Sequence, residues 1–423
     1  MMTLAPETLA EQLRGLDARK ADYATRFVDT LLAAAVSGGA SDVHLTPAAD
    51  GLDVRWRLDG VLHEIGRFPK GEAADIVSRL KVLAQLLTYR HDVPQEGRVR
   101  RGELAEGGAS GGESRASDAV EMRVSTFPTL HGERAVVRLF GGGEAALQSL
   151  ADLGLPDEIT AALTRLLDET SGAILITGPA GSGKTTTLYA SLREIVRRAG
   201  GSKSIVALED PIEVAIDGVA QSQVNPAGGF TLATGLRSLM RQDPEVMMVG
   251  EIRDRETAEA AFQASLTGHL VLTTFHAGGA ASAISRLADM SIEPYQLRSG
   301  VRAILSQRLV RRLCDCAEWN DDEAARLGLP VQRVREPRGC ADCGQTGYRG
   351  RLVLAEMLQP EPSDLGRAIL SRDDAARLQQ LARQSGMVTL WQRAVAAVEQ
   401  GTTSPAEVRR VLGWGATQQD LDG

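Results

Sequence analysis

The spacing of apolar and polar residues predicts a small domain of mixed helices and strands over residues 21–140. In two segments apolar residues recur every three or four positions, which is typical of a helix that buries one face. In several shorter segments they alternate with polar residues, which is typical of half-buried strands. The helical segments are 23–35 and 72–87, and the strand-like segments are 42–45, 52–58, 61–65, 120–126 and 134–140. Residues 1–20 follow neither spacing, so we expect a flexible N-terminus there.

A different pattern begins after the glycines at 141–143, which together with the next residues predict a linker over 141–150. The strand-like segments are now almost continuously apolar, and helical segments alternate with them. This order predicts a parallel sheet with helices on both faces, an α/β domain over 151–361. The strands are expected at 173–177, 204–208, 246–249 and 270–274, and the helices at 184–199, 255–267, 279–290 and 294–310. Amphipathic helices are expected over 362–423, and a surface loop over 103–118.

Composition narrows the class of protein. The chain has 423 residues, 43% of them apolar, which is enough to bury a core and excludes wholesale disorder. Its net charge of −8 argues against a general nucleic-acid-binding role. No apolar run approaches the roughly 18 residues that span a bilayer, and the first 20 residues do not resemble a secretory signal. We therefore expect a large cytoplasmic protein.

A glycine-rich segment follows the strand 173–177 and runs directly into a helix. Its pattern is Gly-x-x-x-x-Gly-Lys-Thr, in which backbone N–H groups turn toward phosphate oxygens and the helix N-terminus adds its positive end. Lys184 is expected to reach the β- and γ-phosphates, and the Thr185 hydroxyl to bind Mg²⁺. The residues predicted to bind ATP are Gly178, Pro179, Ala180, Gly181, Ser182, Gly183, Lys184, Thr185 and Thr186.

Acidic residues follow two other predicted strands, at the edge of the sheet where ligands bind in such folds. Glu209 follows strand 204–208, and Glu251 follows strand 246–249 and one glycine. Hydrolysis of a nucleotide needs one carboxylate to hold Mg²⁺ and one to polarise the attacking water. We predict Glu251 as the metal-holding acid and Glu209 as the second acid.

Two histidines flank the apolar run 270–275. A histidine at a strand end can hydrogen-bond the γ-phosphate, and we take His269 as the candidate for that role. A strand of this length would hold His269 and His276 roughly 20 Å apart, which argues against a metal site shared by the pair.

Residues 40–415 resemble the secretion ATPase family that drives type II secretion and type IV pilus assembly. Besides the phosphate loop, the resemblance rests on blocks similar to the family's aspartate box, Walker B signature and histidine box. These blocks are 208–213, 236–254 and 266–276, and the first domain adds 41–44 and 134–140. Glu245 stands where the family usually has aspartate.

The resemblance implies a RecA-like P-loop NTPase domain preceded by a smaller, PAS-like α+β domain, with ATP bound between the two. It also implies a homo-hexamer in which arginines close on the phosphates and stabilise the charge of the transition state. The candidate arginines are Arg123 and Arg138 from the first domain and Arg237 and Arg253 from the second.

The chain's four cysteines all lie within 314–343, as Cys314, Cys316, Cys340 and Cys343. Four thiols in one short segment of a cytosolic protein indicate a metal site rather than disulfides, and four thiolates favour a closed, structural Zn²⁺ site. Part of the family carries two Cys-x-x-Cys pairs here, whereas the first pair of this chain is Cys-x-Cys. The shorter spacing requires a turn at 314–316, because a strand would place the two thiols on opposite faces.

The phosphate loop and the acids predict a Mg²⁺-dependent ATPase, and the resemblance implies that it drives the assembly of pilin-like subunits for type II protein secretion. It would reach the inner membrane through platform proteins and would not bind nucleic acid. A pilus-extension or competence ATPase is an alternative, and the cysteines argue against a retraction motor. A DNA translocase on the same core is disfavoured by the charge, and a non-hydrolysing scaffold would show no turnover. From residues 1–20 we expect no additional N-terminal docking domain of the kind that many family members carry.

Overall fold

The computed structural model describes residues 6–71, 75–100, 121–139, 149–360 and 364–415. The chain divides into two compact units, the first formed by Met1–Ala146 with Gly339–Thr346 and the second by Leu147–Arg338 with Gly347–Gly423. The predicted surface loop 103–118 and most of the predicted linker 141–150 lie outside the described residues.

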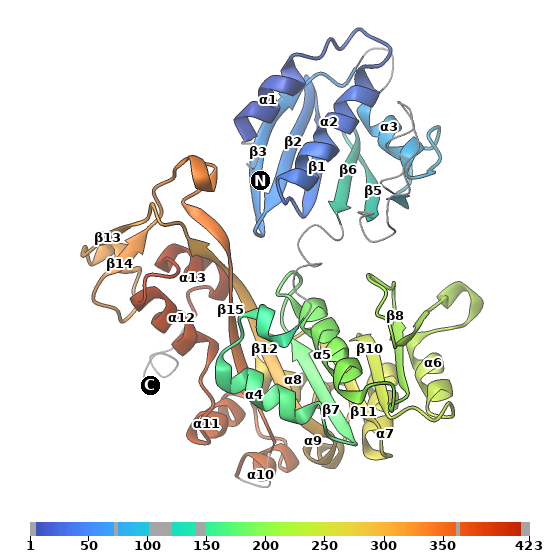
Figure 1. The fold of residues 1–423 in the computed structure, drawn as a ribbon, viewed down its shortest axis with the longest axis vertical. Helices are drawn as coiled ribbons and strands as arrows, with labels where there is room; N and C mark the ends of the chain where they lie inside the picture. The colour runs from blue at the N-terminus through green and yellow to red at the C-terminus, as the bar shows by residue number, and fades with distance from the viewer. Residues whose placement is uncertain (1–5, 72–74, 101–120, 140–148, 361–363, 416–423) are drawn as a thin grey trace. The chain divides into compact units, whose positions relative to one another are not determined.

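The first unit is built on a six-stranded antiparallel sheet with the order β3-β2-β1-β6-β5-β4. Three helices lie along one face of this sheet (Figure 1). The strands are β1 (Asp42–Ala48), β2 (Gly51–Leu58), β3 (Val61–Phe68), β4 (Gln95–Arg100), β5 (Glu121–Thr129) and β6 (Gly132–Leu139). The helices are α1 (Pro6–Arg14), α2 (Tyr23–Ser37) and α3 (Ile76–Leu83).

Alternate residues of the central strands build the core of this unit. Val54 and Trp56 of β2 are fully buried, and Phe27 of α2 belongs to the same apolar cluster. The residues between them point to the opposite face of the sheet, because side chains alternate along a strand. That opposite face carries the charged residues described below.

The N-terminal residues depart from the sequence-based expectation. We predicted a flexible stretch over 1–20, but residues Pro6–Arg14 form α1, and Leu9 and Leu13 are buried in the core of the first unit. Leu9 and Leu13 are four positions apart, which places them on one face of a helix. Two apolar residues are too short a pattern to be recognised in the sequence, and packing against the core is what stabilises this helix.

The second unit is built on a seven-stranded sheet with the order β15-β12-β7-β11-β10-β8-β9. Strands β12, β7, β11, β10, β8 and β9 are parallel, and β15 pairs with β12 in the antiparallel direction. The strands are β7 (Gly172–Thr177), β8 (Ile205–Glu209), β9 (Ala220–Gln223), β10 (Val246–Ile252), β11 (Leu270–Phe275), β12 (Val301–Leu313) and β15 (Tyr348–Leu358). A separate hairpin pairs β13 (Glu318–Asn320) with β14 (Val334–Glu336).

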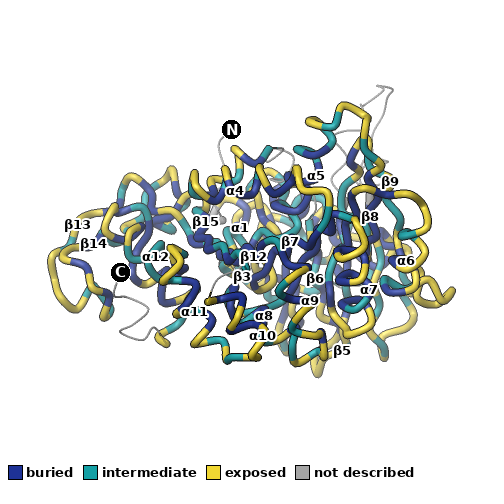
Figure 2. The backbone as a smooth tube through the Cα atoms, turned by 90° about the horizontal axis from the view of Figure 1, so that it is seen from below, coloured by how far each residue is buried: buried dark blue, intermediate teal, exposed yellow. Residues whose placement is uncertain are grey.

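Helices cover both faces of this sheet, as predicted for a parallel sheet. Leu175 of β7 lies in a core with residues of the helices on one face, and its neighbour Ile176 lies in a core with residues of α4 and α5 on the other. Strands β7 and β11 are buried along their whole length. Figure 2 shows β7 in the dark blue of buried residues. The helices are α4 (Asp157–Leu166), α5 (Lys184–Ala199), α6 (Leu232–Leu239), α7 (Arg255–Leu266), α8 (Ala280–Asp289) and α9 (Pro294–Gly300).

The predicted helix over 294–310 is wrong in its second half. Helix α9 ends at Gly300, and Val301–Leu313 forms β12, which lies between β7 and β15 in the sheet. The apolar residues of this segment fit helical spacing as well as a buried strand, and pairing with two neighbouring strands decides between them. Strands β9 and β15 were not predicted.

The C-terminal residues form the expected helices, and a buried glutamate joins them to the sheet. Glu356 of β15 is 5% exposed. One carboxylate oxygen accepts a hydrogen bond from the backbone N–H of Ala280 at 2.8 Å, and the other accepts one from Leu390 at 3.0 Å. A single side chain therefore satisfies the first turns of both α8 and α12. The C-terminal helices are α10 (Asp364–Leu370), α11 (Ala375–Gln384), α12 (Leu390–Glu399) and α13 (Pro405–Leu412).

Candidate active site

The predicted phosphate loop lies between β7 and α5, as the sequence pattern requires. Gly178, Gly181 and Gly183 have positive φ angles of 149°, 75° and 87°. A Cβ atom on Gly178 would lie 2.5 Å from Ser182 Oγ and 2.6 Å from the carbonyl oxygen of Gln307. The loop therefore needs glycine at this position for space as well as for conformation.

Lys184 folds back over its own loop. Its Nζ donates hydrogen bonds to the carbonyl oxygens of Gly178 at 2.9 Å and Pro179 at 3.0 Å. Burial lowers the pKa of Lys184, Glu251 acts to raise it, and Arg308 also lowers it. Lys184 begins α5 directly after the loop that follows β7, and Glu251 lies near the carboxyl end of β10, so both are at the same edge of the parallel sheet. Thr185 and Thr186 are partly exposed on the first turn of α5.

Gln307 of β12 supports the loop from the neighbouring strand. Its Nε2 donates to the carbonyl oxygen of Ser182 at 2.8 Å, and its Oε1 accepts from Thr187 Oγ1 at 3.0 Å. Sequence reasoning missed this residue, because the segment that contains it was predicted to be a helix. No pattern in the sequence marks Gln307, and only the pairing of β12 with β7 brings it to the loop.

Glu251 lies at the carboxyl end of β10, and both of its carboxylate oxygens have partners. His276 Nε2 is 2.6 Å from Oε1, and Arg253 Nε donates to Oε2 at 2.6 Å. Arg253 Nη1 also lies 3.6 Å from Asp210 at the end of β8. Burial lowers the pKa of His276, as does Lys184, whereas Glu251 acts to raise it. Glu251, Arg253 and His276 thus form one charged group at the strand ends beside Lys184.

The structure contradicts the proposed role of His269 within its own chain. His269 precedes β11, and its Nδ1 lies 3.0 Å from the carbonyl oxygen of Ala264, at the end of α7. The amino end of a parallel strand lies at the opposite edge of the sheet from the phosphate loop, so His269 is about one strand length away from it. His276, at the carboxyl end of β11, is the histidine that reaches Glu251.

Glu209 lies at the end of β8 and is 3% exposed. The Tyr189 hydroxyl donates a hydrogen bond to it, and Gln221 Nε2 donates to its Oε1 at 2.8 Å. Burial raises the pKa of Glu209, and these two hydrogen bonds oppose that effect. Glu209 therefore belongs to a hydrogen-bonded group of its own, whereas Glu251 pairs with Arg253 and His276.

The two arginine candidates of the first unit are cross-strand neighbours. Arg123 of β5 lies opposite Arg138 of β6. Arg138 Nε donates to Asp42 at 3.0 Å, Arg57 lies 3.5 Å from the same aspartate, and Arg123 pairs with Glu96. Sequence analysis did not identify Asp42 or Arg57 as partners of these arginines.

The two arginine candidates of the second unit lie in different settings. Arg253 is part of the Glu251 group. Arg237 is exposed on α6, where it contributes a backbone carbonyl to a hydrogen bond with Arg241. Arg253 is therefore the one of the two that contacts a predicted metal ligand.

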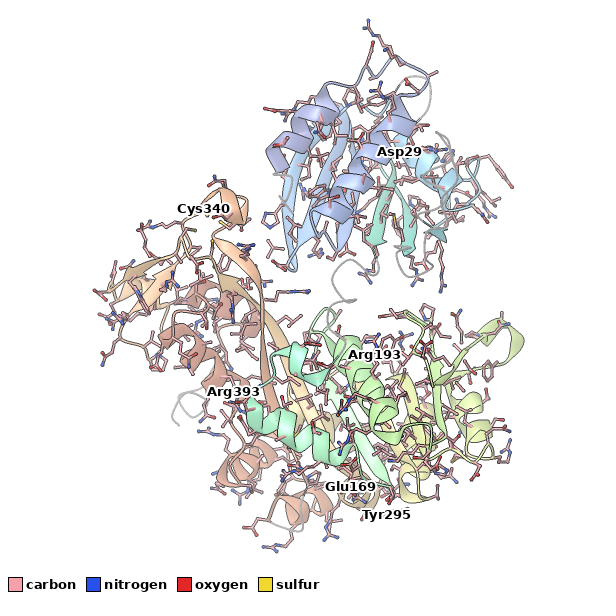
Figure 3. All side chains as sticks on the ribbon, in the orientation of Figure 1. Asp29, Glu169, Arg193, Tyr295, Cys340 and Arg393 are labelled. Carbon is pink, nitrogen blue, oxygen red and sulfur yellow. The ribbon has the colours of Figure 1, made fainter. Side chains whose placement is uncertain are left out.

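The four cysteines come together in the excursion between β12 and β15, and Figure 3 labels Cys340. Their sulfur atoms all lie within 4.8 Å of one another, and Cys314 and Cys343 are buried. Residues 314–316 form a turn after β12, as the Cys-x-Cys spacing requires. Four thiolates at about 2.3 Å from a common centre lie at such separations, so this donor set fits a tetrahedral Zn²⁺ site.

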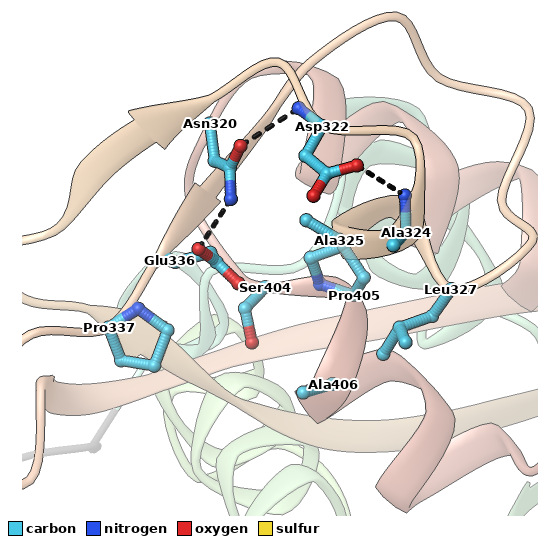
Figure 4. Close-up of a pocket in the computed structure, with 10 residues that line it drawn as sticks. All are labelled: Asn320, Asp322, Ala324, Ala325, Leu327, Glu336, Pro337, Ser404, Pro405 and Ala406. Atoms are coloured by element: carbon cyan, nitrogen blue, oxygen red, sulfur yellow. Dashed lines mark hydrogen bonds between the residues drawn. The ribbon is translucent and has the colours of Figure 1, made fainter.

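A pocket of about 330 Å³ lies between the β13–β14 hairpin and the start of α13 (Figure 4). Asn320 Nδ2 donates to Glu336 at 2.7 Å, and the backbone N–H of Asp322 donates to Asn320 Oδ1 at 2.8 Å. These lining groups bond to one another and fix the shape of the segment. The pocket contains none of the predicted nucleotide-binding residues.

None of the helices in the described part of the chain combines the length and the apolar composition needed to cross a membrane.

Comparison with known proteins identifies the family of the chain. The family model described as "Type II/IV secretion system protein" matches residues 17–410. Type II secretion system protein E of Klebsiella pneumoniae is 41% identical over 416 residues, covering 93% of this chain and 80% of that protein. Type II secretion system ATPase E of Vibrio cholerae is 40% identical over 393 residues, covering 91% and 75%.

More distant relatives share the fold. The type IV pilus assembly ATPase PilB of Thermus thermophilus is 38% identical and is covered over 42% of its length, against 91% of this chain. The structure of the Legionella pneumophila ATPase DotB aligns with a TM-score of 0.65 at 23% identity, covering 91% of this chain and 95% of DotB. The chain belongs to the type II/IV secretion system protein family and is a RecA-like P-loop ATPase.

Proposed function

We propose that this chain hydrolyses ATP as the motor of a type II secretion machine and that turnover drives the assembly of pilin-like subunits. The observation that carries the proposal is the phosphate loop between β7 and α5, with Glu251 at the same edge of the sheet near the end of β10. The identity of about 40% to type II secretion proteins over most of the chain supports this choice of machine.

In this proposal each residue of the site has a distinct task. Loop residues 178–183 and the first turn of α5 present backbone N–H groups to the phosphates, and Lys184 leaves its carbonyl partners to bind the β- and γ-phosphates. Thr185 and Glu251 would hold Mg²⁺, which would supply positive charge to the phosphate oxygens. Glu209 accepts a hydrogen bond from the attacking water.

Arginines from outside the RecA-like unit complete the site in a ring of six copies. Arg123 and Arg138 are held side by side across β5 and β6, so one unit presents two guanidinium groups together. Such cations stabilise the negative charge that develops during phosphoryl transfer. The ring operates at the inner membrane through platform proteins.

Hydrolysis is therefore expected to depend on assembly. Arg138→Ala protein mixed into wild type should lower the specific activity by more than its share of the mixture, because one altered copy disables sites that it completes in the ring. The measurement is ATP turnover against the mixing ratio at constant total protein. Arg67→Ala is the matched control. Arg67 lies on the edge strand β3 and, like Arg138, pairs with an aspartate of the same sheet, since its Nε is 2.7 Å from Asp53. A strictly proportional loss with Arg138→Ala, like that of the control, would contradict shared sites.

The cysteine cluster is proposed to hold one structural Zn²⁺ per chain. Elemental analysis of chelator-washed protein should give a zinc-to-chain ratio near one, with the thiols protected from titration until a strong chelator removes the metal. Cys340→Ser should lower the thermal unfolding temperature and leave Mg²⁺-ATP binding intact, because the site is closed and lies outside the phosphate loop. A ratio near zero, with four thiols titrating in the native protein, would contradict the site.

Pilus extension is the second candidate, and the 38% identity to PilB supports it. The two functions differ in the fibre that depends on the motor. In a strain whose own secretion motor has been deleted, this chain should restore secretion of a folded exoprotein. Restored surface piliation in a pilus-motor deletion, without restored secretion, would favour the alternative.

A further inference from the structure

The buried carboxylate of Glu209 is held by a tyrosine of the phosphate-loop helix. Tyr189 lies on α5, the helix that begins with Lys184, and is 4% exposed. Its hydroxyl donates to Glu209 and accepts the backbone N–H of Glu213 at 3.2 Å. The ring is packed in the core between the sheet and α5, so the position of the hydroxyl is fixed.

A second donor, Gln221 of β9, is equally constrained. Its Nε2 donates to Glu209 at 2.8 Å and to the carbonyl oxygen of Val214 at 3.0 Å. Its Oε1 accepts the backbone N–H of Ile216 at 2.6 Å. The side-chain amide is therefore oriented by the loop between β8 and β9, and its N–H groups face Glu209 and Val214.

We propose that Tyr189 and Gln221 are positioning residues that hold Glu209 in its charged form, aimed at the attacking water. The proposal rests on the proposed ATPase function. A carboxylate has about four lone-pair positions, so two donors leave acceptor capacity for a water. Tyr189 lies on α5, which directly follows the phosphate loop, so the donor to Glu209 and the phosphate cradle belong to adjoining parts of the chain.

The charge of Glu209 depends on these donors because the residue is buried, with 3% of its surface exposed. Burial raises the pKa of the carboxyl group, and hydrogen bonds from Tyr189 and then Gln221 act to lower it. Glu213 faces the same hydroxyl through its backbone N–H. Arg253, from the end of β10, pairs with Asp210 and Glu251 instead of Glu209. The stabilisation of the charged form therefore comes mainly from two neutral donors.

The test is the pH dependence of kcat in Tyr189→Phe, which removes only the hydroxyl. Losing this donor destabilises the carboxylate, so the pKa of Glu209 rises and the acidic limb of the profile should move up by about half to one pH unit. At neutral pH kcat should fall about tenfold, while KM for ATP changes less than about twofold, because the phosphate loop is untouched. Tyr295→Phe is the control, since Tyr295 is 59% exposed, and its profile should match wild type.

The possible outcomes test the role of Tyr189 and the proposed ATPase function separately. An unchanged or downward-shifted acidic limb in folded Tyr189→Phe would overturn the role of Tyr189, whereas wild-type protein without ATP turnover would overturn the ATPase function itself. If Tyr189→Phe does not fold, Gln221→Leu carries the test, because it removes the other donor and should move the limb in the same direction. A lower unfolding temperature with a wild-type pH profile would assign the network to stability alone.

Discussion

Lys184→Ala is expected to lower ATP turnover by about a thousandfold or more and to weaken nucleotide binding. Lys184 is the one side-chain cation of the phosphate loop, and its Nζ already lies over the carbonyl oxygens of Gly178 and Pro179. Charge-stabilising groups of this kind each contribute several kcal/mol in a site from which water is excluded. Alanine is a good helix former, so the first turn of α5 should be retained.

The measurement is steady-state hydrolysis together with equilibrium binding of a fluorescent ATP analogue. Lys203→Ala is the matched control, because Lys203 lies in the same unit beyond the end of α5. It should leave both quantities near wild type. Turnover that survives Lys184→Ala would mean that the nucleotide is hydrolysed somewhere other than at this loop.

Glu251→Gln should separate binding from chemistry. Glutamine keeps the shape of the side chain and can still accept a hydrogen bond from Arg253, but it loses the charge that holds the metal. Turnover is expected to fall by about two to three orders of magnitude, while the ATP dissociation constant stays within a few fold of wild type. Glu259→Gln is the control, since Glu259 pairs with Arg255 on the outside of α7.

Comparing the ATP affinity and turnover of Glu251→Gln with those of Lys184→Ala shows whether Glu251 acts in binding or in hydrolysis. If Glu251→Gln loses ATP affinity as severely as Lys184→Ala, then Glu251 acts mainly in the ground state and is not the acid that serves hydrolysis. Retained affinity with retained turnover would instead move the metal-holding role to another carboxylate at the strand ends, such as Asp210, which shares Arg253 with Glu251.

The phosphate loop could be predicted from the sequence because its chemistry is local. One short stretch supplies the glycines, the lysine and the helix start, and the strand before it is marked by its apolar run. Gln307 could not be predicted, because its contribution comes from a distant strand that reaches the loop only through sheet pairing.

Strand direction, which the sequence also predicts, could have directed the choice to His276 instead of His269. Parallel strands carry their functional groups at their carboxyl ends. His269 precedes the strand and His276 follows it, so strand direction alone favours His276. For Glu209 the sequence indicated the correct edge of the sheet but not its surroundings, because Tyr189 and Gln221 are unremarkable in their own segments and meet the acid only in the folded core.

Glu356 limits how the C-terminal helices of this chain can be lost or exchanged during evolution. Its two oxygens satisfy the starts of α8 and α12, so a gene that lost its last helices would leave a buried carboxylate with an unmet acceptor, at a cost of about 1–3 kcal/mol or more. Helix α8 begins shortly after His276, the partner of Glu251. Glu356 therefore links the start of α8 to the start of α12. Both partners of Glu356 are backbone N–H groups, so a tail exchanged between relatives should keep this contact provided that its α12 begins at the same place.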